Sequence, residues 1–123
     1  MAHVQSLLLA AALLLARTAQ AALGLAELPA SASSGGVTVF YPADGPETGV
    51  SRSPFHFAAA VDAPPSPGNR RLIVISHGSP SSPWVHTDLA RALVDAGFTV
   101  AMPEHEGDNA RNHPDSGPTS WKR

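Results

Sequence analysis

The 123-residue sequence contains no cysteine and has almost no excess charge of either sign. The absence of cysteine excludes a disulfide framework, a thiol nucleophile and any metal site built on thiolates. It does not fix the compartment, because exported proteins can lack disulfides. Eight Lys and Arg residues against ten Asp and Glu residues give a formal net charge of -2 with histidine neutral. This near balance gives no sign of nucleic acid or of an anionic membrane surface as a partner.

Proline and glycine are plentiful, with twelve and ten residues respectively, and no internal repeat is visible. Both residue types interrupt regular structure. Their share therefore predicts many turns and few long helices.

The amino-terminal segment has the pattern of a secretory signal peptide. Residues 7–16 are an uninterrupted run of Leu and Ala, Arg17 ends it, and Ala19-Gln20-Ala21 is a small-x-small cleavage site. Ten apolar residues are too few to span a bilayer, which takes about 20. Residues 1–5 lack the usual Lys or Arg. The pattern predicts a signal peptide over residues 1–21 and a secreted or periplasmic protein with no stable membrane span after cleavage. The alternative is an apolar helix that packs in the core.

The next part of the chain predicts a flexible start followed by two strands. Residues 22–36 are rich in Ser, Ala and Gly, and we expect a flexible lead-in there. Residues 37–41 are β-branched and aromatic and predict a strand that Pro42 ends. Residues 43–53 read as a loop, and residues 55–61 are a weaker strand candidate because of their alanines.

A strand, a helix and a second strand follow in this order. Residues 72–75 (Leu-Ile-Val-Ile) are continuously apolar, which predicts a strand covered on both faces, as in the middle of a parallel sheet. Ser82 and Pro83 suit the cap and first position of a helix, and Gly97 suits its end. Residues 98–102 are a second apolar strand, so the sequence predicts a βαβ unit and an α/β fold. Four apolar residues fall four, four and three positions apart and would therefore share one face of the helix, which we expect to be buried: Val85, Leu89, Leu93 and Ala96.

The sharpest local feature is His77-Gly78-Ser79, directly after the apolar strand. A glycine there lets the backbone turn sharply and approach a ligand. Peptide N–H groups exposed at such a turn can bind a developing oxyanion. The alternative is a strand-to-helix turn that needs glycine for its shape alone.

A longer stretch, residues 72–109, resembles the α/β-hydrolase superfamily, most of all its dienelactone hydrolase-like branch, which includes platelet-activating-factor acetylhydrolases. The resemblance is carried by Ser76-His77-Gly78, by the helix from Trp84 to Phe98, and by Pro103 to Asn109 with its P-x-H-x-GDN pattern. Val39 to Ala43, ending in Tyr-Pro-Ala, is similar to an early strand of that branch. The likeness extends over residues 37–123, and these would form the amino-terminal portion of such a domain, with about four strands and one well-defined helix.

The resemblance implies a serine-type hydrolase that acts on a small ester-like substrate without a cofactor. His77-Gly78-Ser79 would be the oxyanion loop, with the backbone N–H of Ser79 as the best candidate donor and His77 as a structural residue. Ser79 lacks the G-x-S-x-G setting of a nucleophile, and we expect its side chain to face the pocket or solvent.

No G-x-S-x-G occurs in the sequence. In this superfamily the serine, the acid and the base follow in that order. We therefore expect all three beyond Arg123 and a truncated product that is inactive alone. The resemblance also implies the strand order one, two, four, three, with residues 72–75 as an open edge, so that no stable monomer is expected. The alternative function is a non-catalytic exported βα module that binds a small ligand or partner at the turn.

Acidic and histidine residues after Pro103 raise the question of a metal. Neighbouring side chains in an extended segment point apart, and the histidines lack the spacing of a zinc helix. We therefore expect a solvated loop and no metal site. The residues concerned are Glu104, His105, Glu106, Asp108, His113 and Asp115.

Overall fold

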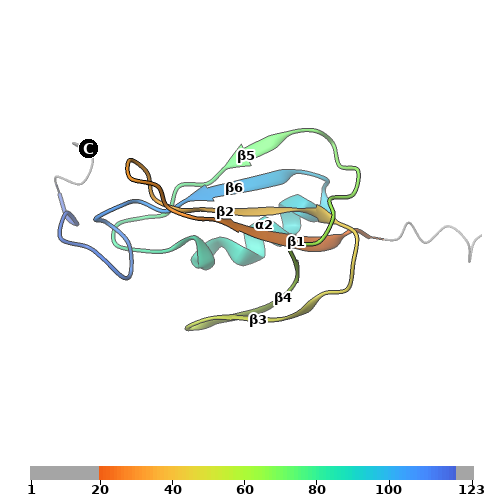
Figure 1. The fold of residues 1–123 in the computed structure, drawn as a ribbon, viewed down its shortest axis with the longest axis horizontal. Helices are drawn as coiled ribbons and strands as arrows, with labels where there is room; N and C mark the ends of the chain where they lie inside the picture. Colours follow the sequence, from red (N-terminus) through yellow and green to blue (C-terminus); the bar gives the residue numbers. More distant parts are fainter. Residues whose placement is uncertain (1–19, 119–123) are drawn as a thin grey trace, which may run out of the picture.

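The computed structural model describes residues 20–118, which form a mixed α/β fold with a six-stranded sheet. The strands are in the order β3-β4-β1-β2-β6-β5 (Figure 1). The elements are β1 (Ala22–Leu28), β2 (Val37–Ala43), β3 (Thr48–Arg52), β4 (Phe55–Val61), β5 (Leu72–Val74), the 3-10 helix η1 (Pro83–His86), α2 (Thr87–Asp95) and β6 (Thr99–Pro103). The predicted α/β class is confirmed, with more strands than the four expected.

The apolar run at residues 7–16, on which the signal-peptide prediction depends, lies outside the described residues. Within residues 20–118, no helix has both the length and the apolar character needed to cross a membrane.

The expected lead-in over residues 22–36 is wrong for its first seven residues, because these form β1. β1 lies inside the sheet, antiparallel to β2 and parallel to β4. Leu23 and Leu25 are 1% and 0% exposed, which places them in the core. Ala and Gly have poor strand propensity, so β1 owes its structure to its neighbours rather than to its own residues. In the same way, residues 48–52 form β3 within the expected loop.

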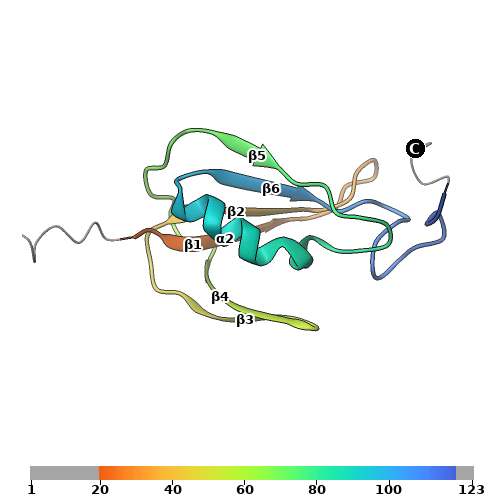
Figure 2. The ribbon, with the colours of Figure 1, turned by 180° about the vertical axis from the view of Figure 1, so that it is seen from behind.

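β2 and β6 bury one face and half-expose the other. Every second side chain of the antiparallel pair is buried, including Phe40, Val100 and Met102. This alternation is the period of two that an extended strand imposes. The buried face lies beneath α2, which crosses β1, β2 and β6 (Figure 2). One helix therefore covers the core side of the three central strands.

The helix is confirmed, but of the face expected to be buried only Leu93 packs against the core. Val85 and Leu89 are 47% and 49% exposed, and Ala96 is exposed. The buried positions are Pro83, Thr87, Ala90 and Val94, which have the same helical spacing. Small residues on this face let the helix approach the sheet. The hydroxyl of the buried Thr87 donates a hydrogen bond to the Trp84 carbonyl at 2.8 Å, so this buried polar group has a partner.

The predicted end of the helix at Gly97 is confirmed. Gly97 has a φ of +91°, a conformation that glycine adopts without strain. Its N–H donates to the Val94 carbonyl at 2.8 Å, and the Phe98 N–H donates to the Leu93 carbonyl at 3.0 Å. These two bonds form a Schellman cap, which satisfies the last carbonyls and turns the chain into β6.

β5 occupies the edge of the sheet, where it pairs in parallel with β6. Leu72 and Val74 are each 61% exposed, so the expectation of cover on both faces is wrong for this strand. The reason is that β5 has one neighbouring strand in the described sheet and that α2 packs over the central strands instead. The expected order is also wrong in detail, because residues 55–61 lie beyond β1 and not beside residues 37–41.

The open edge of β5 predicts self-association, because unpaired backbone groups beside apolar side chains act as a template for another strand. Val74→Lys places a charge on this edge and should lower the scattered light of the protein at a given concentration. Val61→Lys is the control, since Val61 is 48% exposed but lies on β4, which has a neighbour on each side. Equal scattering from both variants would contradict the prediction.

Candidate functional site

The candidate site lies where two parallel strands end. β5 and β6 are adjacent and parallel, so both end on the same side of the sheet. The segments that follow them, residues 75–82 and 104–116, meet at the carboxyl ends of these two strands. A parallel bridge joins Ser81 to Asn109, and the Ala110 N–H donates to the Ser81 carbonyl at 2.8 Å. The predicted His77-Gly78-Ser79 turn belongs to the first of these segments.

His77 ties the turn to the second segment. Its ring is 5% exposed, and Nε2 accepts the His105 backbone N–H at 3.1 Å. A nitrogen that accepts an N–H must carry a lone pair, so the ring proton is on Nδ1, which donates to the Gly78 carbonyl at 2.9 Å. Both ring nitrogens are therefore occupied by backbone groups. This gives His77 a structural role and leaves it no nitrogen to serve as a base.

The Ser79 side chain also holds the loop. Its hydroxyl donates to Asp108 Oδ1 at 2.5 Å, and the Ser116 hydroxyl donates to the same oxygen at 2.8 Å. Asp108 is 4% exposed, so these bonds serve a buried carboxylate. Ser79 is exposed, as expected, but its hydroxyl is engaged with Asp108. A hydroxyl that donates to a carboxylate in this way is not the activated nucleophile of a serine hydrolase.

The backbone at Gly78 and Ser79 is open. No heavy atom of the described residues lies within 4 Å of the position that a Cβ would take on Gly78. Its φ is outside the left-handed region, so neither strain nor packing in this structure requires a glycine. Among residues 20–118, no backbone carbonyl accepts the Ser79 N–H. The Ser79 N–H therefore has no backbone partner among these residues, and the space next to Gly78 is unfilled.

A serine–histidine contact that the sequence did not predict lies at the carboxyl ends of β5 and β6. Ser76 Oγ is 2.7 Å from Nε2 of His105, and the two residues lie at corresponding places, each two residues past the end of its strand. The ring of His105 packs edge-on against that of His77, with centroids 4.4 Å apart. The signal that could have found the contact is the shared position after two parallel strands.

This contact has the distance at which an imidazole can take a proton from a hydroxyl. Among the described residues, no carboxylate hydrogen-bonds the other ring nitrogen of His105, so no third group orients the base. A second exposed pair, Ser51 Oγ and His56 Nδ1 at 2.9 Å, lies on the β3–β4 hairpin. Such contacts therefore also occur away from the candidate site, and distance alone does not identify a nucleophile.

Three of the acidic and histidine residues after Pro103, which are Glu104, His105 and Asp108, have separate partners. Glu104 pairs with Arg111 at 2.7 Å, and the hydrogen bond that Arg111 donates to Glu104 raises the pKa of Arg111 above its ordinary value. His105 contacts Ser76, and Asp108 accepts from two serines. Across residues 20–118, no group of three or more His, Asp or Glu side chains is arranged to hold a metal ion.

Two cavities border the loop that follows β6. Their volumes are about 480 Å³ and about 250 Å³, and Trp84, Glu104 and Arg111 line both. Residues 76–79 line neither of them. Gly78 and Ser79 are exposed and border neither of these cavities.

Comparison with protein-family models, with curated proteins and with solved structures finds no match to this chain. The local geometry at the ends of β5 and β6 is therefore the basis on which a function is proposed.

The bonds of His77 predict a stabilising role for this side chain. His77→Ala leaves the His105 N–H without its acceptor, which we expect to cost about 1–3 kcal/mol and to speed amide exchange at His105. His86→Ala is the control, because this half-buried ring on η1 makes no hydrogen bond within residues 20–118. The control should change the free energy of unfolding by no more than about 0.5 kcal/mol. Equal effects of the two variants, measured by urea unfolding and hydrogen exchange, would refute this role.

Proposed function

We propose that this chain supplies the oxyanion-binding turn of an exported serine-type hydrolase that acts on carboxylic ester or related acyl bonds. The observation that carries the proposal is the Ser79 backbone N–H, which has no backbone acceptor among the described residues and lies beside the open space at Gly78. His77 and Asp108 fix the turn from both sides. A donor held in this way needs no rearrangement when negative charge develops on a carbonyl oxygen.

The arrangement of the sheet supports the proposal. The resemblance implies four strands in the order one, two, four, three. In the sheet, four neighbouring strands lie in the spatial order β1, β2, β6, β5. This matches the implied order when β1 (Ala22–Leu28) is counted as strand one, β2 as two, β5 as three and β6 as four. The turn then follows the third strand, which is where the resemblance puts the oxyanion loop.

In the proposed reaction a nucleophile attacks the acyl carbon, and the carbonyl oxygen becomes an oxyanion. The Ser79 N–H would donate to this oxygen, and a second N–H would come from the residue after the nucleophile. By the resemblance, the nucleophilic serine and its acid and base belong to a segment outside this sequence. The part played by this chain is thus the stabilisation of charge.

A second candidate is that Ser76 itself is the nucleophile, with His105 as its base. The 2.7 Å contact between Ser76 Oγ and Nε2 of His105 favours it, as does its place two residues from Gly78. Two observations weigh against it. Within residues 20–118, no carboxylate hydrogen-bonds His105, and a similar contact joins Ser51 to His56 away from the site. We therefore rank it below a nucleophile from outside this sequence.

The proposal predicts that a side chain at Gly78 blocks the oxyanion site without disturbing the fold. Gly78→Ala should lower kcat/KM of the complete gene product for p-nitrophenyl esters by about 10²-fold or more. The added methyl group would keep the substrate oxygen away from the Ser79 N–H, and the loss of one oxyanion donor costs about 10²–10³-fold. Gly49→Ala is the matched control, because an added Cβ on β3 also meets no heavy atom within 4 Å. Unchanged activity in Gly78→Ala would overturn the proposal. A complete gene product that is inert towards esters but binds a small ligand at the turn would favour the non-catalytic module.

Covalent labelling separates the two candidate nucleophiles. An alkyl fluorophosphonate reacts with activated serines, and mass spectrometry identifies the labelled residue. We expect no label on Ser76 or Ser51 of the 123-residue chain, because no hydrogen bond within residues 20–118 joins a carboxylate to either histidine partner. A label on Ser76 that is absent from Ser51 and is lost in His105→Ala would establish the second candidate instead.

A further inference from the structure

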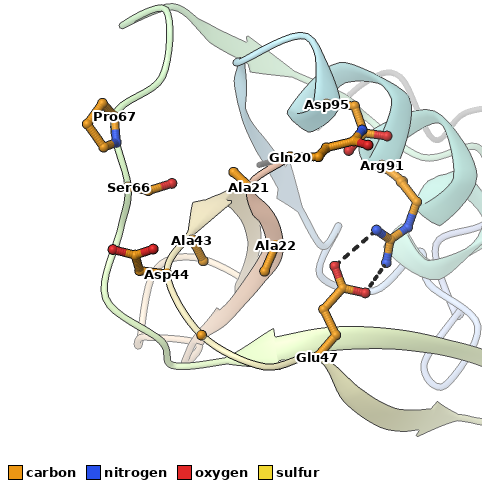
Figure 3. A pocket seen from close by; sticks show the side chains of 11 residues that line it. Gln20, Ala21, Ala22, Ala43, Asp44, Glu47, Ser66, Pro67, Arg91 and Asp95 are labelled. Atoms are coloured by element: carbon orange, nitrogen blue, oxygen red, sulfur yellow. Dashed lines mark hydrogen bonds and ion pairs between the residues drawn. The ribbon is translucent and has the colours of Figure 1, made fainter. Parts of the chain in front are cut away.

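A cavity of about 730 Å³ lies where β1 begins and β2 ends. Three carboxylates and one guanidinium line it, from Asp44, Glu47, Asp95 and Arg91 (Figure 3). The cavity therefore carries an excess of negative charge, which suits a cation. Ser66 also lines it, and among the described residues its buried hydroxyl oxygen has no hydrogen-bond partner. This hydroxyl oxygen is left to a water or to another polar group that enters the cavity.

The peptide bond between Ala21 and Ala22 lies in this cavity, since both residues line it. This is the bond that the Ala19-Gln20-Ala21 pattern predicts to be cut when a signal peptide is removed. Hydrolysis by a signal peptidase adds one water across the bond. It leaves a carboxylate on Ala21, which departs with residues 1–21, and an amine on Ala22, which takes up a proton.

Glu47 lies next to the position of that amine, and Asp44 lines the same cavity. Glu47 Oε1 accepts the Leu23 N–H at 2.7 Å, and the Ala22 nitrogen is one residue further back, at most about 3.6 Å along an extended chain. Successive backbone N–H groups of a strand point to opposite sides, so the peptide N–H of Ala22 in the uncleaved chain points towards β2. An ammonium has three N–H bonds and can donate to both sides. The register partner of Ala22 on β2 is Ala43, which Asp44 follows. Ala22, Asp44 and Glu47 all line the cavity drawn in Figure 3.

The charge balance favours capture of an ammonium. Arg91 donates to Glu47 Oε2 at 2.8 Å and to Oε1 at 3.1 Å, and this bond holds the pKa of Glu47 below its ordinary value. Arg91 thus balances one carboxylate of the cavity. Asp44 makes no side-chain hydrogen bond with the described residues, and Asp95 lies on the helix one turn beyond Arg91. An ammonium at Ala22 would supply the missing positive charge.

We propose that this cavity binds the amino terminus created by cleavage between Ala21 and Ala22, with Asp44 and Glu47 as its anionic partners. Removal of the signal peptide then adds an ion pair at the start of β1, an interior strand of the sheet. The uncleaved chain has a neutral peptide N–H at this place and cannot form the pair. The inference rests on the predicted signal peptide and does not depend on ester hydrolysis.

The test begins with the full precursor produced in a host that exports proteins. Intact mass and amino-terminal sequencing should give a product whose first residue is Ala22. Competitive acetylation over a range of pH then gives the pKa of its α-amino group. We expect this pKa to lie at least about half a unit above the ordinary value of about 7.7–8.0, because nearby carboxylates favour the charged form.

Variants identify the carboxylates responsible. Asp44→Asn and Glu47→Gln should each bring the α-amino pKa back towards its ordinary value. Asp88→Asn, which removes an exposed carboxylate of α2 that does not line the cavity, should leave it unchanged. If Glu47→Gln fails to fold because Arg91 and Leu23 lose their partner, Asp44→Asn still decides. The proposal is overturned by a product that begins elsewhere, by one that keeps residues 1–21, or by an ordinary pKa that Asp44→Asn does not move.

Discussion

The candidate site depends on the parallel pairing of β5 with β6. The register sets Val74 opposite Ala101, and the Ile75 N–H continues the ladder by donating to the Ala101 carbonyl at 2.9 Å. β5 ends at Val74, and β6 continues past Ala101 to Pro103 along β2. The turn at residues 77–79 then meets the loop that carries Asp108, and the contacts of the turn follow from this pairing. A slip of one residue would turn each side chain of β5 to the opposite face of the sheet.

The parts of the fold that the sequence predicted are those with a strong local signal. Residues 72–75 and 98–102 are continuous apolar runs, and Gly97 ends the helix because the cap needs a positive φ. The turn at residues 77–79 follows from its place after such a run. These features depend on a few neighbouring residues, so their identity is readable without a partner segment. The likeness to hydrolases remains a proposal, because it comes from motifs and not from a matched relative.

The parts that the sequence could not predict are decided by contacts between distant segments. β1 has the residues of a linker, and only its pairing with β2 and β4 makes it a strand. The helix carries two stripes at helical spacing, and the smaller side chains of Ala90 and Val94, not the larger Leu89, pack against the sheet. Ser76 and His105 are 29 residues apart in sequence. Their contact needs the β5–β6 register, which no local pattern reveals.

The central claim is that the Ser79 backbone N–H binds the oxyanion of an ester substrate. A crystal structure of the complete gene product, after reaction with a phosphonate ester, tests it most directly, because the phosphonyl oxygen stands in for the oxyanion. The account predicts this oxygen about 2.7–3.1 Å from the Ser79 nitrogen, with Gly78 facing the adduct and the bond between Ser79 and Asp108 retained. An adduct whose phosphonyl oxygen is bound by other groups, away from residues 77–79, would contradict it.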